Sequence, residues 1–456
     1  MMDKELALQT GNSNDGRPAH PGFREAFWYW LKLGFISFGG PAGQIAIMHQ
    51  DLVEKRRWIS ERRFLHALNF CMLLPGPEAQ QLAIYLGWLL HRTWGGIVAG
   101  VLFVLPSLFI LAALTWVYLA FGDMTLVQGI FAGIKPAVVA IVLFAAWRIG
   151  SRALKNHLMW LLAGAAFIAI FFFRVPFPLI VVGAALLGAL GGKWLPGYFQ
   201  PGGGHGATDK HFGSAVIDDD TPPLAHTRHS YRHLFKLLGS ALALWALVIL
   251  LLPAGTLTDM AVFFSKAALV TFGGAYAVLP YVYQGGVESY GWLTGPQMVD
   301  GLALGESTPG PLIMVVAFVG FVGGWTFELF GSDHLFLAGL VAASVATFFT
   351  FLPSFVFILA GGPLVESTHG DLKFTAPLSA ITAAVVGVIL NLALFFGWHV
   401  LWPQASAEQP FVGGFEWFSG LLALAAFIAL WRFNISILKV LAVSALLGLG
   451  FTTLVL

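Results

Sequence analysis

Charged residues are scarce in this chain of 456 residues, making up 10% of the sequence against 58% for hydrophobic residues. Soluble domains carry about 25% charged residues, so the composition excludes an ordinary soluble protein and indicates an integral membrane protein. Cysteine occurs once, as Cys71, which excludes a disulfide framework or a thiolate metal cluster built by this chain alone. The net charge of +1 and the lack of a long basic run argue against binding to nucleic acid.

Sequence signatures of cofactors and metals are also lacking. Gly191-Gly192-Lys193-Trp194 has neither the upstream glycine nor the Ser or Thr of a nucleotide-binding P-loop, and no haem, flavin or nicotinamide pattern stands out. Five histidines near the middle of the chain have spacings that match no tight metal site: His205, His211, His226, His229 and His233. We therefore expect no cofactor and no metal, and direct ATP hydrolysis and redox catalysis are disfavoured.

Hydrophobic runs of membrane-spanning length or nearly so fill most of the chain, since a span needs about 20 apolar residues. This predicts an all-α, polytopic membrane protein. The runs cover residues 27–48, 64–90, 97–121, 126–147, 158–173, 175–190, 234–252, 260–283, 298–327, 335–360, 374–396, 415–430 and 437–456.

The region 38–78 recurs at a fixed offset of 234 residues. The first motif, Phe38-Gly39-Gly40-Pro41, aligns with Phe272-Gly273-Gly274, with Ala275 in place of the proline. The second motif, Pro75-Gly76-Pro77, aligns with Pro309-Gly310-Pro311. Apolar composition alone would give roughly a quarter to a third of the observed identities, so the chain is an internal duplication. Twelve of 46 ungapped positions are identical: Lys32, Phe38, Gly39, Gly40, Gln50, Val53, Glu54, Trp58, Leu68, Pro75, Gly76 and Pro77.

The duplication and the composition divide the chain into four parts. Residues 1–22 are a polar tail without a signal-peptide pattern, and residues 23–195 form the N-terminal repeat. Residues 196–233 are rich in Gly, His, Asp and Pro and read as a flexible cytoplasmic linker, because they cannot bury enough apolar surface to fold alone. Residues 234–456 form the C-terminal repeat, with one extra leading helix.

The two repeats are expected to have inverted topology. The loop at 49–63 holds five cations, whereas its partner at 284–297 holds neither Lys nor Arg. By the positive-inside rule the first loop faces the cytoplasm and the second faces the outside. The five cations are Lys55, Arg56, Arg57, Arg62 and Arg63.

The segment 64–90 is predicted to enter the membrane and return, turning at Pro75-Gly76-Pro77. This arrangement keeps the cations Arg148, Arg152 and Lys155 on the cytoplasmic side. Proline and glycine free backbone groups that lipid cannot satisfy, so such a turn must be buried in protein or line a wet cavity.

A repeated pair of broken hydrophobic segments indicates the substrate site of a transporter. Glycine permits positive φ and proline ends a helix, so helix N-termini, which attract anions, would lie deep in the membrane. Lys32 and Lys266 precede the two Phe-Gly-Gly motifs at matching positions; each is either a functional cation or a side chain that reaches the interface. The predicted anion-binding residues are Lys32, Gly39, Gly40, Pro41, Gln44, Pro75, Gly76, Pro77, Lys266, Gly273, Gly274, Ser307, Thr308, Pro309, Gly310 and Pro311.

Two carboxylates and two arginines complete the candidates. Glu78 follows the first Pro-Gly-Pro and Glu306 precedes the second, and buried carboxylates of this kind could carry a coupling proton. Arg62 and Arg63 lie at the mouth of the predicted hairpin and could recruit an anion, although loop arginines also serve as topology signals alone.

The paired motifs and the loop around Trp58 resemble the chromate ion transporter (CHR) family in its long-chain, two-domain form, over nearly the whole chain. The resemblance implies a multi-pass protein of the bacterial or archaeal cell membrane, in bacteria the inner membrane, that exports chromate and confers chromate resistance. It also implies a link to the proton-motive force. Its partners would be chromate or a related oxyanion and the lipid bilayer. A homodimer is compatible with the sequence, which does not fix the oligomeric state.

Three alternatives stay open at this point. Sulfate and molybdate are oxyanions that the same groups could bind. A passive channel would conduct without responding to a pH gradient. A membrane-embedded enzyme is less favoured, because the duplicated motifs are symmetric and a catalytic cluster would be asymmetric.

Overall fold

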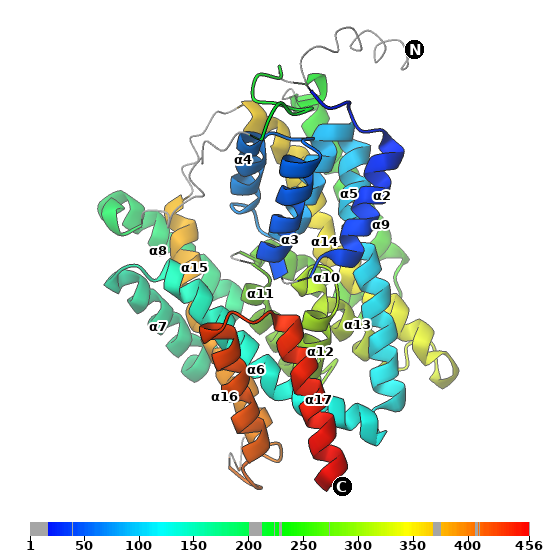
Figure 1. The fold of residues 1–456 in the computed structure, drawn as a ribbon, viewed down its shortest axis with the longest axis vertical. Coiled ribbons are helices and arrows are strands. Elements are labelled where there is room, and N and C mark those ends of the chain that lie inside the picture. Colours follow the sequence, from blue (N-terminus) through cyan, green and yellow to red (C-terminus); the bar gives the residue numbers. More distant parts are fainter. Residues whose placement is uncertain are drawn as a thin grey trace.

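The computed structural model describes residues 17–38, 40–199, 212–222, 224–227, 230–272, 274–367, 375–405, 409 and 411–455. They form a helical protein, as predicted, and seven of its helices are long and apolar enough to cross a membrane (Figure 1). Gly39, Gly273, most of the N-terminal tail and part of the expected linker, residues 200–211, 223, 228 and 229, lie outside the described residues.

The second half repeats the order of helices found in the first half, after one additional helix, α9. The first half contains α2 (Phe23–Ile36), α3 (Gly40–His49), the π-helical η1 (Gln50–Lys55), α4 (Glu61–Cys71), α5 (Glu78–Phe121), α6 (Thr125–Ala153), α7 (His157–Phe173) and α8 (Phe177–Trp194). The second half contains α9 (Tyr231–Leu251), α10 (Thr256–Val270), α11 (Ala275–Tyr283), the π-helical η4 (Gln284–Ser289), α12 (Gly295–Ser307), the 3-10 turn η5 (Leu312–Met314), α13 (Val315–Thr326), α14 (Leu335–Ser367), α15 (Thr375–Leu401), α16 (Trp417–Arg432) and α17 (Ile437–Val455).

Residues 27–48 do not form one continuous span. Helix α2 ends at Ile36, and α3 with η1 returns to the end of the molecule where α2 begins. Two contacts show this return: Arg56 Nη1 lies 2.9 Å from Glu25 Oε1, and the rings of Tyr29 and Trp58 are 5.5 Å apart. The equivalent pair in the second half, Phe263 and Trp292, also has its ring centroids 5.5 Å apart, so α10 and α11 form the same kind of hairpin.

The predicted hairpin around Pro75-Gly76-Pro77 is also present. Helix α5 is in fact two helices, because the backbone leaves helical geometry at His91 and at Arg92, whose φ is 57°. Its first part, α5a (78–90), returns to the end where α4 begins, and His91 Nε2 there lies 3.0 Å from the carbonyl of Pro21. The second part, α5b (93–121), runs back through the molecule. The two parts can pack this closely because residue 87 is glycine: a Cβ there would lie 2.5 Å from the carbonyl oxygen of Gly95.

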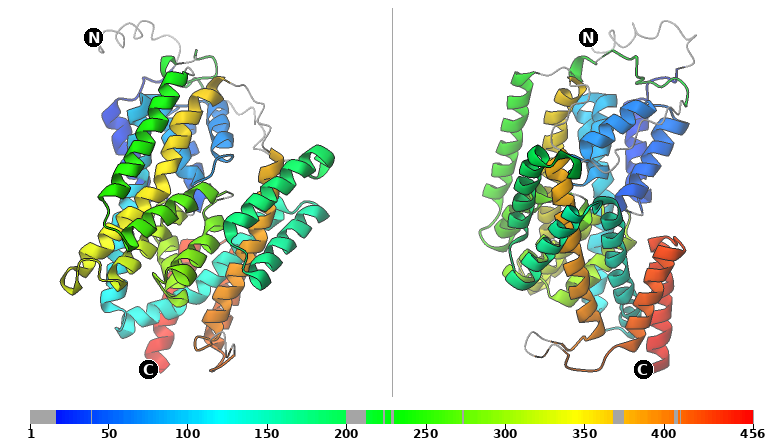
Figure 2. Two further views of the ribbon diagram at one scale, coloured as in Figure 1. Left: turned by 180° about the vertical axis from the view of Figure 1, so that it is seen from behind. Right: turned by 90° about the vertical axis from the view of Figure 1, so that its left-hand side faces the viewer.

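The helices pack into two groups that do not follow the sequence halves. One group contains α2, α5, α10, α13 and α14, and the other contains α6, α7, α8, α15, α16 and α17 (Figures 1 and 2). Equivalent helices of the two halves meet in each group, α5b with α14 and α6 with α15. The repeats are therefore interlocked and do not form two separate domains.

Equivalent helices run antiparallel where they meet. A Cβ on Gly100 of α5b would touch Phe355 of α14, whereas Trp116, at the other end of α5b, has its ring 5.9 Å from that of Phe336 at the start of α14. In the second group, Gly150 of α6 faces Val386 of α15, and Val139 of α6 faces Gly397.

Part of the expected flexible linker is instead bound to the basic loop. Ile217 pairs with Ile59 in an isolated β-bridge, and Ser60 Oγ donates to Asp219 Oδ1 at 2.6 Å. His226 Nε2 lies 3.1 Å from the carbonyl of Trp88. Residues 212–227, where described, thus form a cap over this end of the molecule. The composition failed to predict it because the basic loop supplies partners for its backbone and for Asp219, while Arg17 pairs with Asp220.

Candidate functional site

The two Pro-Gly-Pro turns meet the two helix ends before the Phe-Gly-Gly motifs in the interior of the protein. The N–H of Gly76 donates to the carbonyl of Thr271 at 2.8 Å, and the N–H of Gly310 donates to the carbonyl of Ser37 at 2.7 Å. Gly76 and Gly310 are equivalent positions of the repeat, and so are Ser37 and Thr271. Each half therefore holds the broken helix of the other half by the same hydrogen bond.

Only glycine fits at the centre of these turns. The φ angles of Gly76 and Gly310 are 126° and 110°, a region that L side chains rarely adopt. A Cβ at Gly76 would lie 2.7 Å from Ser354 Oγ, and one at Gly310 would lie 2.7 Å from Ser107 Oγ. Each turn thus rests on a serine of the opposite half, and both serines follow a Leu-Pro pair, in Leu105-Pro106-Ser107 and Leu352-Pro353-Ser354.

Four helical segments begin either at these Pro-Gly-Pro turns or at the Phe-Gly-Gly motifs. Helix α3 begins at Gly40, with Pro41 in its first turn, and α5a begins after Pro77. In the second half, α11 begins after Gly274, and η5 with α13 begins after Pro311. Free N–H groups and the helix dipole make such N-termini favourable places for an anion.

Gln44, one of the predicted residues, connects the two halves. Its side chain is buried, and Nε2 donates to the carbonyl of Gly310 at 2.6 Å and to that of Ser37 at 3.3 Å. Gln81, in the first turn of α5a, similarly donates from Nε2 to the carbonyl of Pro75 at 2.7 Å. Both amides brace the turns from within the first repeat.

Buried polar atoms without a protein partner gather around this centre. Such atoms normally have a partner in protein or water, because leaving one unsatisfied costs about 1–3 kcal/mol. Ser37, Gln80 and Ser107 each carry an O–H or N–H donor that an oxyanion could use. The orphaned atoms here are Ser37 Oγ, Gln44 Oε1, Gln80 Nε2 and Oε1, Gln81 Oε1 and Ser107 Oγ.

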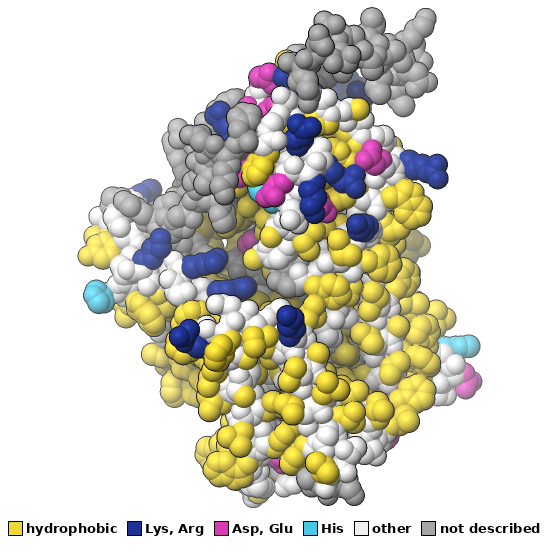
Figure 3. Space-filling model, viewed as in Figure 1, with side chains coloured by type: hydrophobic (Ala, Val, Ile, Leu, Met, Phe, Trp, Pro, Cys, Tyr) yellow, Lys and Arg dark blue, Asp and Glu magenta, His cyan; other side chains and the backbone are white. Residues whose placement is uncertain are grey.

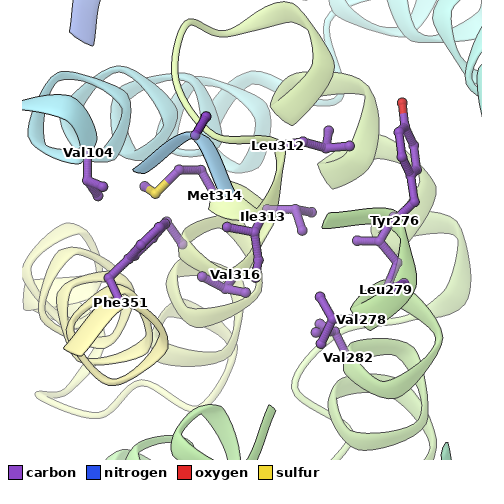
Figure 4. Close-up of a cluster of buried hydrophobic side chains, with 14 of the residues drawn as sticks. Val104, Tyr276, Val278, Leu279, Val282, Leu312, Ile313, Met314, Val316 and Phe351 are labelled. Atoms are coloured by element: carbon purple, nitrogen blue, oxygen red, sulfur yellow. The ribbon is translucent and has the colours of Figure 1, made fainter. Parts of the chain in front are cut away.

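The buried amide side chains at this centre all come from the first repeat. The positions equivalent to Gln44, Gln80 and Gln81 are Val278, Met314 and Val315, all fully buried apolar side chains. Figure 4 shows Val278 and Met314 among the apolar residues that line α11 and η5. This asymmetry agrees with the sequence, in which only the first repeat has Pro41 and the basic loop. Ser37 and Ser107 were missed as site residues, although Leu105-Pro106-Ser107 recurs as Leu352-Pro353-Ser354.

The predicted acidic and hydroxyl residues of the second repeat are already engaged. Glu306 is buried and accepts a hydrogen bond from the hydroxyl of Tyr276, while the guanidinium of Arg148 acts on it electrostatically. Ser307 and Thr308 donate to carbonyls of their own helix at 3.0 and 3.1 Å, so their hydroxyl protons cap α12. Glu78 of the first repeat is half-buried at the start of α5a.

A basic cavity of about 360 Å³ runs along α2 toward the centre. Lys32 lines it and has no ion-pair partner among the described residues, because Glu25 pairs with Arg56 instead. The lining reaches Ile36, the residue before Ser37, and its net charge is positive (Figure 3 shows cations gathered over this end). Lys266 is exposed and does not line this cavity. The first cavity is lined by Tyr29, Lys32, Leu33, Ile36, Asp51, Lys55 and Arg56.

Arg63 binds the cap formed by residues 212–227. Its guanidinium donates to the carbonyls of Asp218 and Thr221 at 2.8 and 2.7 Å and lies 3.3 Å from Glu366 Oε2. With its donors occupied, Arg63 is a poor candidate for recruiting an anion, whereas Arg62 is exposed.

Comparison with known proteins agrees with the duplicated fold. The profile of a family described as Chromate transporter matches residues 24–189 and 258–449. The chain is 30% identical to the chromate transport protein of Cupriavidus metallidurans, over 93% of this chain and 92% of the relative. It is also 30% identical to the chromate transport protein of Pseudomonas aeruginosa, over 96% and 95%, and 26% identical to the probable chromate transport protein of Synechococcus elongatus, over 91% of each chain. No solved structure matches the chain.

Proposed function

The chain belongs to the chromate transporter family, and from this premise we propose that it is a secondary transporter that exports chromate across the bacterial inner membrane. The proton-motive force is the proposed energy source. A dianion that leaves a cell with a negative interior releases about 4.6 kcal/mol per 100 mV, so the membrane potential alone favours export and proton coupling can add to it.

The observation that carries the proposal is the cluster of unsatisfied polar atoms where the broken helices meet. Ser37, Gln80 and Ser107 present donors there, and the helix starts add backbone N–H groups and the positive ends of their dipoles. Such a site stabilises an oxyanion by hydrogen bonds from neutral donors. The basic cavity with Lys32 leads the anion along α2 toward these donors.

We propose that the two repeats have inverted topology in the membrane. The antiparallel packing of α5b on α14 and the cations on the first loop support this orientation, with the first loop in the cytoplasm. The hairpins of the first repeat then enter from the cytoplasm, and those of the second repeat enter from the outside. The Pro-Gly-Pro turns are buried in protein between them, as lipid requires.

Two experiments separate this function from its alternatives. Inside-out vesicles containing the protein are expected to take up labelled chromate faster than vesicles without it, and faster still with an imposed pH gradient. Equal uptake with and without the protein would refute chromate transport. Sulfate and molybdate are tested in the same vesicles, because backbone and hydroxyl donors discriminate weakly between oxyanions of similar shape, and faster uptake of either would identify it as the substrate. A chromate flux that ignores the gradient would favour a channel.

The topology is tested by cysteine labelling in a Cys71→Ala background. Arg57→Cys in the first loop and Tyr290→Cys in the equivalent loop are expected to react with an impermeant maleimide from opposite sides of the membrane. Labelling of both from the same side would refute the inverted topology.

A further inference from the structure

An ion pair with a buried carboxylate, which was not among the predicted site residues, joins α6 to α12. Lys135 Nζ is 3.3 Å from Asp300 Oδ1, and the hydroxyl of Tyr118 donates to Asp300 Oδ2 at 2.8 Å. The Asp300 side chain is only 3% exposed. A charge pair in the interior of a membrane protein is costly and points to function. The signal was available, because each charge interrupts an apolar run.

A second cavity, of about 300 Å³, reaches the lysine of this pair. Lys135 is part of its wall, and His399 and Glu416 are its other ionisable residues. The ends of α15 and α17 that line it lie at the opposite end of the molecule from the basic loop (Figures 1 and 2). The whole lining comprises Ala132, Lys135, Pro296, Val299, His399, Val400, Pro403, Glu416, Phe418, Ser419, Phe451 and Thr452.

The charges of this cavity do not suit an oxyanion. Lys135 is neutralised by Asp300, and Glu416 adds a negative charge to the wall. The basic cavity along α2 has the opposite balance, with Lys32, Lys55 and Arg56 against Asp51. A dianion is therefore favoured at the first cavity and repelled from the second, whereas water and protons can enter the second.

From this arrangement we propose that Asp300 is the residue that binds the coupling proton, and that the second cavity is its route of access from the side opposite the basic loop. A proton from cavity water converts the Asp300 carboxylate to the carboxyl, while Lys135 stays an ammonium ion. The charge of the pair changes from zero to +1 and returns to zero when the proton leaves. In the part of the chain that the structure describes, the ionisable groups that face Asp300 are Lys135 from α6 and Tyr118 from α5b.

The pair is connected to the centre of the protein through α12. Ser307 ends this helix about 10 Å along its axis from Asp300, and the Pro309-Gly310-Pro311 turn follows it. Protonation of Asp300 weakens its ion pair with Lys135, which attaches α12 to α6. A shift of α12 would move the Pro309-Gly310-Pro311 turn, whose Gly310 N–H donates to the carbonyl of Ser37. Proton binding and anion binding are thus linked by one helix.

The inference rests on the proposed proton-linked transport, and its test uses the same vesicles. Asp300→Asn is expected to abolish the stimulation of chromate uptake by a pH gradient while potential-driven uptake remains. Asp259→Asn, which changes an exposed acid on α10, is the matched control and keeps the wild-type stimulation. If the pH gradient still stimulates uptake by Asp300→Asn, the role of Asp300 would be refuted, but the proposed proton-linked transport would stand. A wild type that does not respond to the gradient would overturn the proton link as well.

A second measurement covers the case in which Asp300→Asn fails to fold because Lys135 is left unpaired. The double variant Lys135→Gln/Asp300→Asn removes both charges and is expected to insert normally and to lack the gradient response. In the Cys71→Ala background, Ser419→Cys in the cavity wall should react with an impermeant maleimide from the side opposite the basic loop. Ser151→Cys, exposed near Arg152, should react from the other side. Ser419→Cys that is unreactive, or reactive only from the side of the basic loop, would refute the access route.

Discussion

The N–H of Gly310 donates a hydrogen bond to the carbonyl of Ser37 at 2.7 Å, across 273 positions of the sequence and between the two repeats. Ser37 ends the first helix of the N-terminal repeat, and Gly310 is the apex of the second Pro-Gly-Pro turn. The bond satisfies a carbonyl that the broken helix leaves without an intrahelical partner. The proposed substrate site therefore depends on contacts between the two halves.

This contact predicts that Gly310→Ala severely impairs transport. The substitution forces a side chain into a positive φ, at about 1–2 kcal/mol, and against Ser107 Cβ at 2.6 Å, where overpacking costs about 1–3 kcal/mol. We expect the initial rate of chromate uptake into vesicles to fall at least tenfold, because the turn must move away from Ser37.

Gly183→Ala in α8 is the matched control, since a Cβ there meets nothing within 4 Å. It is expected to keep wild-type uptake and membrane insertion. Uptake by Gly310→Ala within twofold of this control would show that the turn does not shape the site.

The unsatisfied amide of Gln80 leads to a prediction in which stability and transport change in opposite directions. Gln80→Met introduces the residue that the second repeat has at the equivalent position, Met314. Removing a buried polar group without a partner is neutral or stabilising for the fold, so the melting temperature should be equal or higher. Chromate uptake should fall about tenfold, since the site loses a donor worth about 1.5 kcal/mol to a charged ligand. A variant with wild-type uptake would exclude Gln80 from the site.

Much of this architecture could be predicted from the sequence. The repeat, the helix breaks and the hairpin at Pro75-Gly76-Pro77 follow from local chemistry, because glycine and proline disrupt helices wherever they occur in these runs. The position of α9, which has no counterpart among the described helices of the first half, also follows from the offset of the repeat.

Contacts between distant segments could not be predicted in this way. The α2–α3 reversal was missed because an apolar run of spanning length looks the same whether it crosses or returns. Arg63 looked like a loop cation, yet its three acceptors come from residues 218, 221 and 366, which only the fold brings together. The unequal polarity of the repeats is present in the sequence, where Gln44, Gln80 and Gln81 align with Val278, Met314 and Val315, but which of the polar atoms lack a partner depends on the fold.

The docked cap is expected to loosen at low pH through His226. Burial lowers the pKa of this imidazole below its usual value of 6.5, so the docked state favours the neutral ring and the released state binds protons more readily. The stability of the docked cap is therefore complete above pH 6.5 and declines as the pH falls below it. The protection factors of the amides of residues 224–227, which compare their exchange rates with the intrinsic rates at the same pH, should fall as the pH is lowered from about 7.5 to about 5.5. His226→Gln should remove this dependence, and an unchanged dependence in the variant would assign it to another group.

The two lysines that the repeat places at equivalent positions are expected to differ in function. Lys32 lines the basic cavity with no acidic partner among the described residues, whereas Lys266 is exposed on α10 outside both cavities. Lys32→Ala should raise the KM for chromate about threefold to tenfold at low ionic strength with little change in kcat, because it weakens the attraction of the dianion before it reaches the site. Added salt should shrink the difference from wild type, since screening removes the same attraction. Lys266→Ala should retain the wild-type KM at both salt concentrations, and equal effects of the two substitutions would contradict the assignment of the anion path to the first repeat.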